Sequence, residues 1–376
     1  WSRPQSVMLA ASADPADGGR GPGPLIDQSV RNIVRLTGTG TAVRLRLSNR
    51  YGATLTPEGT LPLLVTAATV GRRTQGAAVT ALRTVTFAGR VEVTIPPGGT
   101  VLSDPVALPV SEGQVVAVSL HVDATPMAPQ HGASFVTSYV SPLLSGDHTR
   151  DASGTAYTEK TLTTSILSGV DIRTNRVRGV IATTGGSVVD GHGSDPDTFT
   201  DWPSWLSRRV TDRTVVNNGL GGTTAAAACA VPGTGPSVEE RVGHDSLQLA
   251  GVTHLLVYAG TNDIAGVFTG DEIISSYRSI LAQARTRGVR VLISTITPRG
   301  AYTAMQNAER AKVNAWVRAG GRCSGECHRS LDFDAVARDP ANHQQLDPKI
   351  DSGDGIHPNG EGYRRIAASI PLAALR

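Results

Sequence analysis

The sequence contains no apolar run near the length of about 18 residues that a membrane-spanning helix needs. Long runs of lysine and arginine are also absent, and 35 basic against 32 acidic residues leave a net charge of +3. Neither a nucleic acid nor a membrane surface is therefore expected as a partner. Aromatic residues make up only 4% of the chain, whereas 42 glycines and 22 prolines favour many turns and short strands. Hydrophobic residues, at 39%, provide enough apolar area for buried cores.

Cysteine is scarce, with only Cys229, Cys323 and Cys327 present. An odd number this small does not build a disulfide framework, although Cys323 and Cys327 could be paired or could both be reduced. No metal is expected, because no second close pair of cysteine or histidine accompanies them and the calcium-loop spacing is absent around Asp351. No signal peptide is visible, but the sequence starts at Trp1 rather than Met, so a removed leader stays open. The compartment is therefore left undetermined, with the odd cysteine count and the lack of a visible leader favouring a cytoplasmic over a secreted location.

The length of 376 residues predicts at least two domains, and the sequence changes character near residue 175. Before that point, short stretches of alternating apolar and polar residues lie between turns, for example at 43–47, 91–95 and 115–122. This alternation is typical of half-buried strands, and no long amphipathic helix interrupts it. Residues 1–174 are therefore predicted to form an all-β sandwich of antiparallel strands, with a jelly roll as one form of it.

After residue 175 the pattern alternates between strands and helices. Short apolar strands are predicted around 180–182, 215–216, 255–258 and 291–293, with helices near 202–210 and 303–319. Another helix lies between the last two strands, and its predicted buried face comprises Ile273, Ile274, Tyr277, Ile280, Leu281 and Ala284. Alternation of this kind predicts a parallel sheet with right-handed crossovers. The active site of such a sheet lies beyond the carboxyl ends of its strands.

Chemically useful residues occur at these predicted strand ends and near the C-terminus. Ser187 follows two glycines, a glycine-rich turn ends at Gly222, and Asn262 follows the third strand. Asp354 and His357 lie three residues apart, which lets the carboxylate accept a hydrogen bond from the imidazole. Each stretch alone is more often an ordinary loop, turn or helix cap. Together they provide a nucleophile, a base, an orienting acid and oxyanion donors, the parts that acyl transfer through serine requires.

In this order the four stretches resemble the SGNH hydrolases, also called the GDSL esterase/lipase family. The resemblance covers about residues 177–376, and the whole chain is further similar to two-domain actinobacterial members in which a β-sandwich precedes the catalytic domain. It implies a multidomain chain, with a jelly-roll-like sandwich at 1–174 and a three-layer α/β catalytic domain at 175–376. Further stretches that carry the resemblance include 30–35, 43–49, 103–106, 332–334, 338–340 and 352–354.

The resemblance also implies a role for each motif residue. Ser187 would be the nucleophile, His357 the general base and then the general acid, and Asp354 the residue that orients the imidazole. The oxyanion hole would consist of the backbone N–H groups of Ser187 and Gly222 and the side chain of Asn262. No cofactor is implied.

Two positions depart from the family pattern. Gly186 stands where the family usually has aspartate, which removes a hydrogen-bonding carboxylate beside the nucleophile, and Thr223 replaces a common Asn or Asp. Neither change removes a triad residue or the Gly222 N–H group.

His192 follows the nucleophile loop and is either an ordinary loop residue or part of the pocket lining. Tyr302, after the fourth strand, is a further candidate for substrate contact.

Three functions are compatible with these residues. The first is hydrolysis of a small-molecule carboxylic ester through an acyl-enzyme. The second is acyl transfer from acyl-CoA to a hydroxyl acceptor, such as a natural product in polyketide tailoring, which depends on whether water or an alcohol reaches the acyl-enzyme. The third is deacetylation of a carbohydrate bound by the β-sandwich, which rests on fold analogy.

Overall fold

The computed structural model describes residues 1–5, 24–51, 61–227, 235–320 and 329–376. Cys229, Cys323 and Cys327 lie outside the described residues, so their pairing and packing are not considered further. The chain divides into two compact units, Trp1–Arg176 and Val177–Arg376. The division falls two residues after the boundary expected from the change in sequence pattern.

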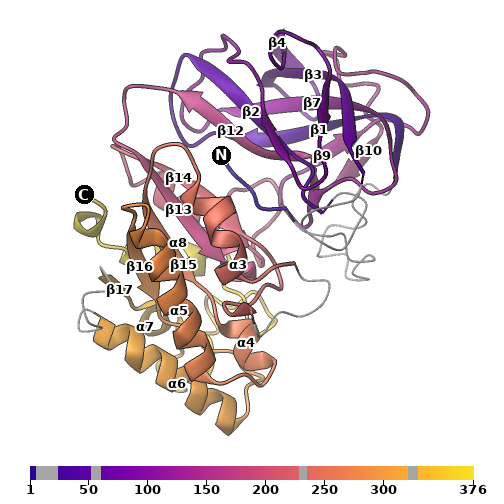
Figure 1. Ribbon diagram of the computed structural model, residues 1–376. Coiled ribbons are helices and arrows are strands. Elements are labelled where there is room, and N and C mark those ends of the chain that lie inside the picture. Colours follow the sequence, from indigo (N-terminus) through magenta and orange to yellow (C-terminus); the bar gives the residue numbers. More distant parts are fainter. Residues whose placement is uncertain (6–23, 52–60, 228–234, 321–328) are drawn as a thin grey trace. The chain divides into compact units, whose positions relative to one another are not determined.

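The first unit is built from antiparallel strands (Figure 1). One sheet has the order β10-β9-β1-β7-β3-β4 with β5 paired to β3, a second has the order β12-β2-β6, and β8 pairs with β11. The strands are β1 (Leu25–Arg35), β2 (Ala42–Ser48), β3 (Leu63–Arg73), β4 (Val79–Thr84), β5 (Val93–Ile95), β6 (Thr100–Leu102), β7 (Val115–Thr125), β8 (Gln130–His131), β9 (Ser138–Val140), β10 (Glu159–Thr161), β11 (Thr164–Ser165) and β12 (Leu167–Arg173). The strand predicted at 91–95 is shorter than expected, because only residues 93–95 pair with β3, and Val91 is 55% exposed ahead of it.

The two larger sheets of this unit share one hydrophobic core. Val34 and Val118 from the first sheet and Leu45 and Val170 from the second all belong to it, and each is at most 1% exposed. Alternating side chains direct every second residue of a strand to the same face, so both sheets can bury an apolar face against the other. Antiparallel strands are thus observed in the described part of this unit, and the sandwich and its jelly-roll form stay predictions.

The second unit contains a five-stranded parallel sheet of order β14-β13-β15-β16-β17. The strands are β13 (Val180–Gly185), β14 (Thr214–Gly219), β15 (Val252–Tyr258), β16 (Arg290–Ser294) and β17 (Arg329–Leu331). The helices are α1 (Ser187–Asp190), α2 (Trp202–Ser207), α3 (Val238–Val242), α4 (Thr261–Ala265), α5 (Gly270–Arg285), α6 (Ala304–Ala319), α7 (Phe333–Ala337) and α8 (Gly360–Ser369), with a π-helical turn at Gly243–Leu247 and a 3-10 turn at Leu372–Leu375. The predicted parallel α/β fold is confirmed.

Helices cover both faces of this sheet (Figure 1). Along β15, Leu255 and Val257 pack with residues of α3, α5 and α6, whereas Leu256 and Tyr258 pack with residues of α2, α7 and α8. The strands are buried on both sides, which explains why they read as continuous apolar runs in the sequence.

Local sequence signals define the long helices. In α5, Thr269 accepts from the backbone N–H of Glu272, whose side chain in turn accepts from the backbone of Thr269, a capping box that satisfies two free N–H groups. Thr303 and Gln306 form the same box at the start of α6. The predicted apolar face of α5 is buried at all six positions.

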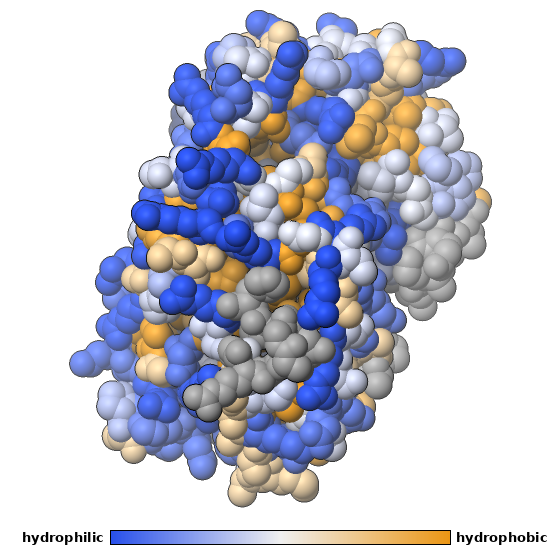
Figure 2. Space-filling model, turned by 60° about the vertical axis from the view of Figure 1, so that its left-hand side comes forward, coloured by the Kyte–Doolittle hydropathy of each residue, from blue (hydrophilic) through white to orange (hydrophobic). Residues whose placement is uncertain are grey.

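The surface is mixed in polarity. On the face in view in Figure 2, hydrophilic residues are spread widely, with apolar residues gathered in smaller areas between them. Among the described residues, no helix is long and apolar enough to cross a membrane.

Candidate active site

The register of the sheet brings three loops to one edge. Gly185 at the end of β13 pairs with Gly219 of β14 on one side and with Tyr258 of β15 on the other. The chain leaves β13 toward β14 first and then crosses to β15, so a topological switch point lies between β13 and β15. Ligands of open α/β sheets bind at such a point, outside the carboxyl ends of the strands.

Glycine is required for the tight turn that precedes Ser187. A Cβ atom on Gly185 would lie 1.7 Å from the carbonyl oxygen of Tyr258, and one on Gly219 would lie 2.1 Å from the backbone nitrogen of Asp190. The close approach lets the chain turn directly from β13 into α1. Ser187 is the first residue of this helix and is partly exposed at the sheet edge.

The structure brings together the three residues predicted as a triad. Ser187 Oγ lies 2.8 Å from His357 Nε2, and His357 Nδ1 lies 2.5 Å from Asp354 Oδ2. An ionised Asp354 accepts the proton on Nδ1, which leaves Nε2 free to accept a hydrogen bond from the Ser187 hydroxyl. Ser187 and His357 are 170 residues apart in sequence. The arrangement can therefore deprotonate the serine hydroxyl as it attacks a carbonyl carbon.

The ionisation of these groups suits that chemistry. Burial alone would raise the pKa of Asp354, but hydrogen bonds from the His357 ring and from the backbone N–H groups of His357 and Ile356 outweigh it and lower the pKa to about 2. Burial is also the largest effect on His357 and lowers its pKa, while Asp354 raises it. His357 therefore stays neutral, and can act as a base, at pH values at which a free imidazole would already be protonated.

A self-contained loop between α7 and α8 holds Asp354 and His357. The carboxylate of Asp351 accepts from the backbone N–H groups of Gly353 and Gly355 at 2.8 and 3.1 Å. The N–H of Ser352 donates to the carbonyl of His357 at 2.9 Å and closes the loop. Gly353 and Gly355 have φ values of 108° and 71°, a region that favours glycine. In the sequence, Asp351 suggests only a possible metal ligand, and no motif there indicates this role.

The predicted oxyanion donors lie around Ser187. Within the described part of the chain, the backbone N–H groups of Ser187 and Gly222 donate to no protein acceptor. Asn262 lies in the first turn of α4 and donates one N–H to the carbonyl of Thr223 at 2.9 Å, which orients its amide. Its second N–H is not used in that bond. These are donors of the kind that stabilise an oxyanion.

Buried charged residues that no sequence motif indicates hold the three loops in place. Asp190 accepts from the N–H of Gly221 at 3.1 Å, inside the glycine-rich turn. Arg241 donates to the carbonyls of Gly185 and Asn218, at the ends of β13 and β14. Asp263, in the first turn of α4, accepts from the backbone N–H groups of residues 225 and 226. Isolated Asp and Arg residues give no sequence signal of such contacts.

The two positions that depart from the pattern of the resembled family lie close to the predicted oxyanion donors. Gly186 has φ of −86°, which any residue can adopt. A Cβ atom there would lie 3.3 Å from the carbonyl oxygen of Thr223 and 3.5 Å from Nδ2 of Asn262. The absent carboxylate would therefore stand beside Asn262. The Thr223 hydroxyl donates to the carbonyl of Pro236 at 2.6 Å, so it fastens the glycine-rich turn to a later segment.

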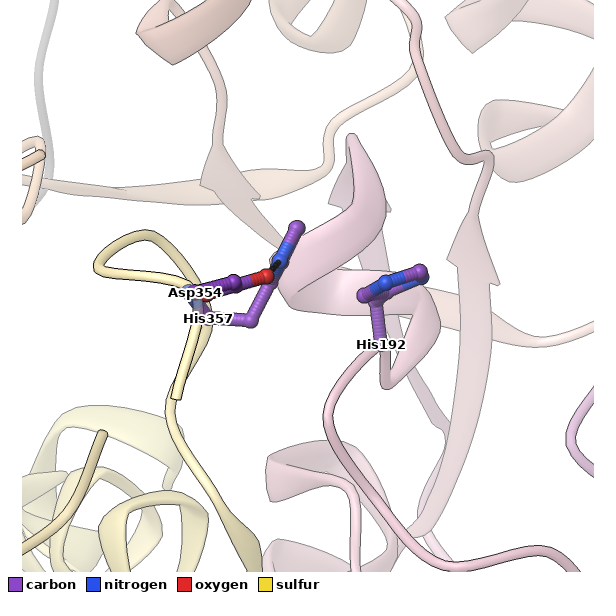
Figure 3. Close-up of side chains that lie close together, drawn as sticks. All are labelled: His192, Asp354 and His357. Atoms are coloured by element: carbon purple, nitrogen blue, oxygen red, sulfur yellow. Dashed lines mark hydrogen bonds and ion pairs between the residues drawn. The ribbon is translucent and has the colours of Figure 1, made fainter. Parts of the chain in front are cut away.

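His192 lies against His357, which favours the pocket-lining interpretation over an ordinary loop residue. Its ring centroid is 4.2 Å from that of His357, with an angle of 43° between the planes (Figure 3). Ligand atoms of His192, Asp354 and His357 all lie within 4.8 Å of one another. Both ring nitrogens of His357 already bind Ser187 and Asp354, so the cluster is organised for proton transfer rather than as a preformed metal site.

Replacing His192 with alanine is expected to move the acid limb of the pH–activity profile to higher pH. The His192 charge lowers the pKa of His357, and its ring helps to bury the base, so both effects of removal raise that pKa. Activity at pH 6 should fall severalfold, whereas activity above pH 8 should change little. The profile of kcat/KM measures this directly, and His192→Gln, which keeps a polar side chain without the charge, should shift in the same direction. A shift to lower pH would contradict the expectation.

Comparisons with known proteins extend these observations. Residues 183–365 match the model of the GDSL-like Lipase/Acylhydrolase family. Among solved structures, a putative lipolytic protein of the G-D-S-L family from Desulfitobacterium hafniense is 19% identical and covers 52% of this chain and 98% of its own, with a TM-score of 0.42. A carbohydrate acetylesterase family member from Sinorhizobium meliloti is 18% identical, with coverages of 52% and 98% and a TM-score of 0.42. An aryl esterase from M. smegmatis is 15% identical, with coverages of 52% and 97% and a TM-score of 0.41. No curated protein matches.

Proposed function

Residues 183–365 belong to the GDSL-like lipase/acylhydrolase family and form an enzyme of the serine esterase type, and from this premise we propose that Ser187 is its nucleophile. The proposed reaction is hydrolysis of a small-molecule carboxylic ester through an acyl-enzyme. The observation that carries the proposal is the continuous set of hydrogen bonds from Ser187 through His357 to Asp354.

The first half-reaction follows from these contacts. As Ser187 Oγ attacks the ester carbonyl, its proton passes to His357 Nε2, and the resulting imidazolium is stabilised by Asp354. The carbonyl oxygen becomes an oxyanion, which the N–H groups of Ser187 and Gly222 and the amide of Asn262 stabilise. When the C–O bond to the leaving alcohol breaks, His357 returns the proton to that oxygen.

The second half-reaction regenerates the serine. Water donates a proton to His357 Nε2 as its oxygen attacks the acyl carbon, and the same three donors stabilise the second oxyanion. Collapse of this intermediate breaks the bond to Ser187 Oγ, which regains the proton, and a carboxylic acid leaves. An alcohol in place of water would give acyl transfer by the same steps.

Replacing Asn262 with alanine is expected to lower kcat for ester hydrolysis by about 10²- to 10³-fold, the usual effect of removing one oxyanion donor. KM should change little, because the donor acts on the charge that develops in the transition state. Steady-state kinetics on a short ester measure both constants. Asn262→Asp, which keeps the size of the side chain but adds a negative charge, should be at least as impaired. A variant with unchanged kcat would exclude Asn262 from the oxyanion hole.

Intact-mass analysis of the full chain tests the reaction. Wild type and Ser187→Ala are mixed separately with a short activated ester and with a short acyl-CoA. A wild-type adduct that clears rapidly in water supports hydrolysis, and an adduct that persists until an alcohol is added supports acyl transfer. An adduct that also forms on Ser187→Ala would contradict the assignment of the nucleophile.

We further infer that residues 175–376 are the catalytic domain and that residues 1–174 form an accessory β-sandwich. The antiparallel sheets that share one core support the second part. The assignment of the catalytic domain is supported by the position of the proposed site residues, which all lie in the second unit: Ser187, Asn262, Asp354 and His357.

A further inference from the structure

Arg299 lies on the segment between β16 and α6, which borders the proposed site on two sides. The N–H of Gly300 donates to the carbonyl of Gly355 at 2.9 Å, so this segment is bonded to the loop that carries Asp354 and His357. The hydroxyl of Tyr302 lies 2.9 Å from Thr261 Oγ1, next to Asn262. The segment that carries Arg299 is therefore bonded both to the loop of Asp354 and His357 and to Thr261, the neighbour of Asn262 in sequence.

The guanidinium of Arg299 has no acidic partner within the described part of the chain. Its only contact of a charged or aromatic kind there is with the Tyr302 ring, whose centroid is 5.7 Å from Cζ. Other arginines of the same unit bind carboxylates: Arg310 lies within 2.5 Å of Asp334, and Arg318 binds Asp332 and Asp334. Arg299 is partly buried, so its charge is incompletely solvated and is not neutralised by a neighbour.

The Tyr302 ring lies within cation–π range of this guanidinium. Tyr302 is itself anchored by its hydroxyl, which also donates to the carbonyl of Thr261 at 2.5 Å. A guanidinium held over an aromatic face keeps its N–H groups directed outward in its own plane, where they can form paired hydrogen bonds to a carboxylate or phosphate. The charge also acts at the site, because it contributes to lowering the pKa of His357.

We propose that Arg299 is a specificity-determining residue that binds an anionic group, a carboxylate or a phosphate, on the ester substrate. This inference rests on the proposed function, since it concerns the substrate of the same site. The preferred substrates are then esters that carry a negative charge on the acyl or the alcohol part. Hydrogen bonds to a charged group typically contribute enough free energy to change kcat/KM by about 10-fold or more.

The test compares anionic esters with uncharged esters of similar shape at pH 8 in the full chain. For the acyl side the pair is monomethyl glutarate and methyl pentanoate, and for the alcohol side it is 4-carboxyphenyl butyrate and phenyl butyrate. A phosphorylated pair, 4-phosphonooxyphenyl butyrate and phenyl butyrate, distinguishes phosphate from carboxylate. The quantity measured is the ratio of kcat/KM for the anionic and neutral members, in wild type and in Arg299→Met. Intrinsic reactivity cancels when the ratios of the two proteins are compared.

We expect the ratio of at least one pair to fall about 10-fold in Arg299→Met and to fall less in Arg299→Lys, which keeps the charge but loses the planar fork. Raising the salt concentration should lower the ratio in wild type. The matched control is Arg278→Met, which removes an exposed arginine that also lies over an aromatic ring, Trp316, and should leave every ratio unchanged.

The inference would be overturned if the ratio of kcat/KM for anionic and neutral esters were the same in wild type and in Arg299→Met for every pair. If Arg299→Met does not fold, the Arg299→Lys ratios and the salt dependence decide in the same way. Failure of the proposed function is recognised separately, because turnover would then survive in Ser187→Ala.

Discussion

Replacing Ser187 with alanine is expected to reduce kcat/KM for a short ester by about 10⁴-fold or more. The alanine variant keeps His357, Asp354 and the oxyanion donors but has no oxygen to form the acyl-enzyme, so only direct attack by water, aided by the groups that remain, survives. Ser187 contributes a single partly exposed hydroxyl to the structure, and the variant should unfold at nearly the same temperature as wild type. Kinetics and a thermal melt of the same preparations measure both quantities.

A neighbouring serine provides the matched control. Ser194 lies in the segment that follows α1, and within the described part of the chain its buried hydroxyl has no hydrogen-bond partner. Ser194→Ala should therefore retain activity close to that of wild type. Undiminished turnover by Ser187→Ala, or an equal loss of activity in Ser187→Ala and Ser194→Ala, would contradict the assignment of Ser187 as the nucleophile.

Replacing Asp354 with asparagine is expected to lower kcat by about 10⁴-fold, nearly as much as removal of the nucleophile. Asp354 accepts the hydrogen on His357 Nδ1 and two backbone N–H groups, of Ile356 and His357. An amide can present an N–H to Nδ1 instead, which would place the imidazole proton on Nε2 and direct it toward Ser187. The base would then be in the wrong tautomer and could not accept the serine proton.

The pH dependence separates this effect from a general loss of structure. The pKa of Asp354 is lowered to about 2, so in wild type this carboxylate stays ionised throughout the working range and the acid limb of kcat/KM reports His357 alone. Removal of the carboxylate takes away the group that raises the pKa of His357, so the residual activity of Asp354→Asn should have its acid limb at lower pH. An unchanged profile with full activity would contradict the role of Asp354.

The sequence allowed the parallel α/β fold and the residues of the proposed triad to be predicted in detail. Strands buried on both faces leave continuous apolar runs, and α5 leaves a 3.6-residue period with a capping box, so each element can be identified locally. Ser187, Asn262 and His357 occur in short motifs because the turns that hold them need glycine and other specific residues at fixed offsets. The turn before Ser187 is an example, since a Cβ on Gly185 would collide with Tyr258.

The supporting contacts could not be predicted in this way. Asp190, Arg241 and Asp263 bind backbone groups of loops that are up to 56 residues away in sequence, and the chemistry of each residue type allows many other partners. His192 and Arg299 likewise have no motif of their own. Their relation to the site follows from which loops the sheet order places side by side.

The sequence by itself determined the types of the elements, the change of character near residue 175 and the identity of the candidate catalytic groups. Only the tertiary structure decided that Ser187 and His357 meet, that His192 lies against the base, and that the charge of Arg299 has no acidic partner in the described part of the chain. The physical reason is that backbone periodicity and turn chemistry are local. Distances between loops depend instead on the strand order and register of the whole sheet.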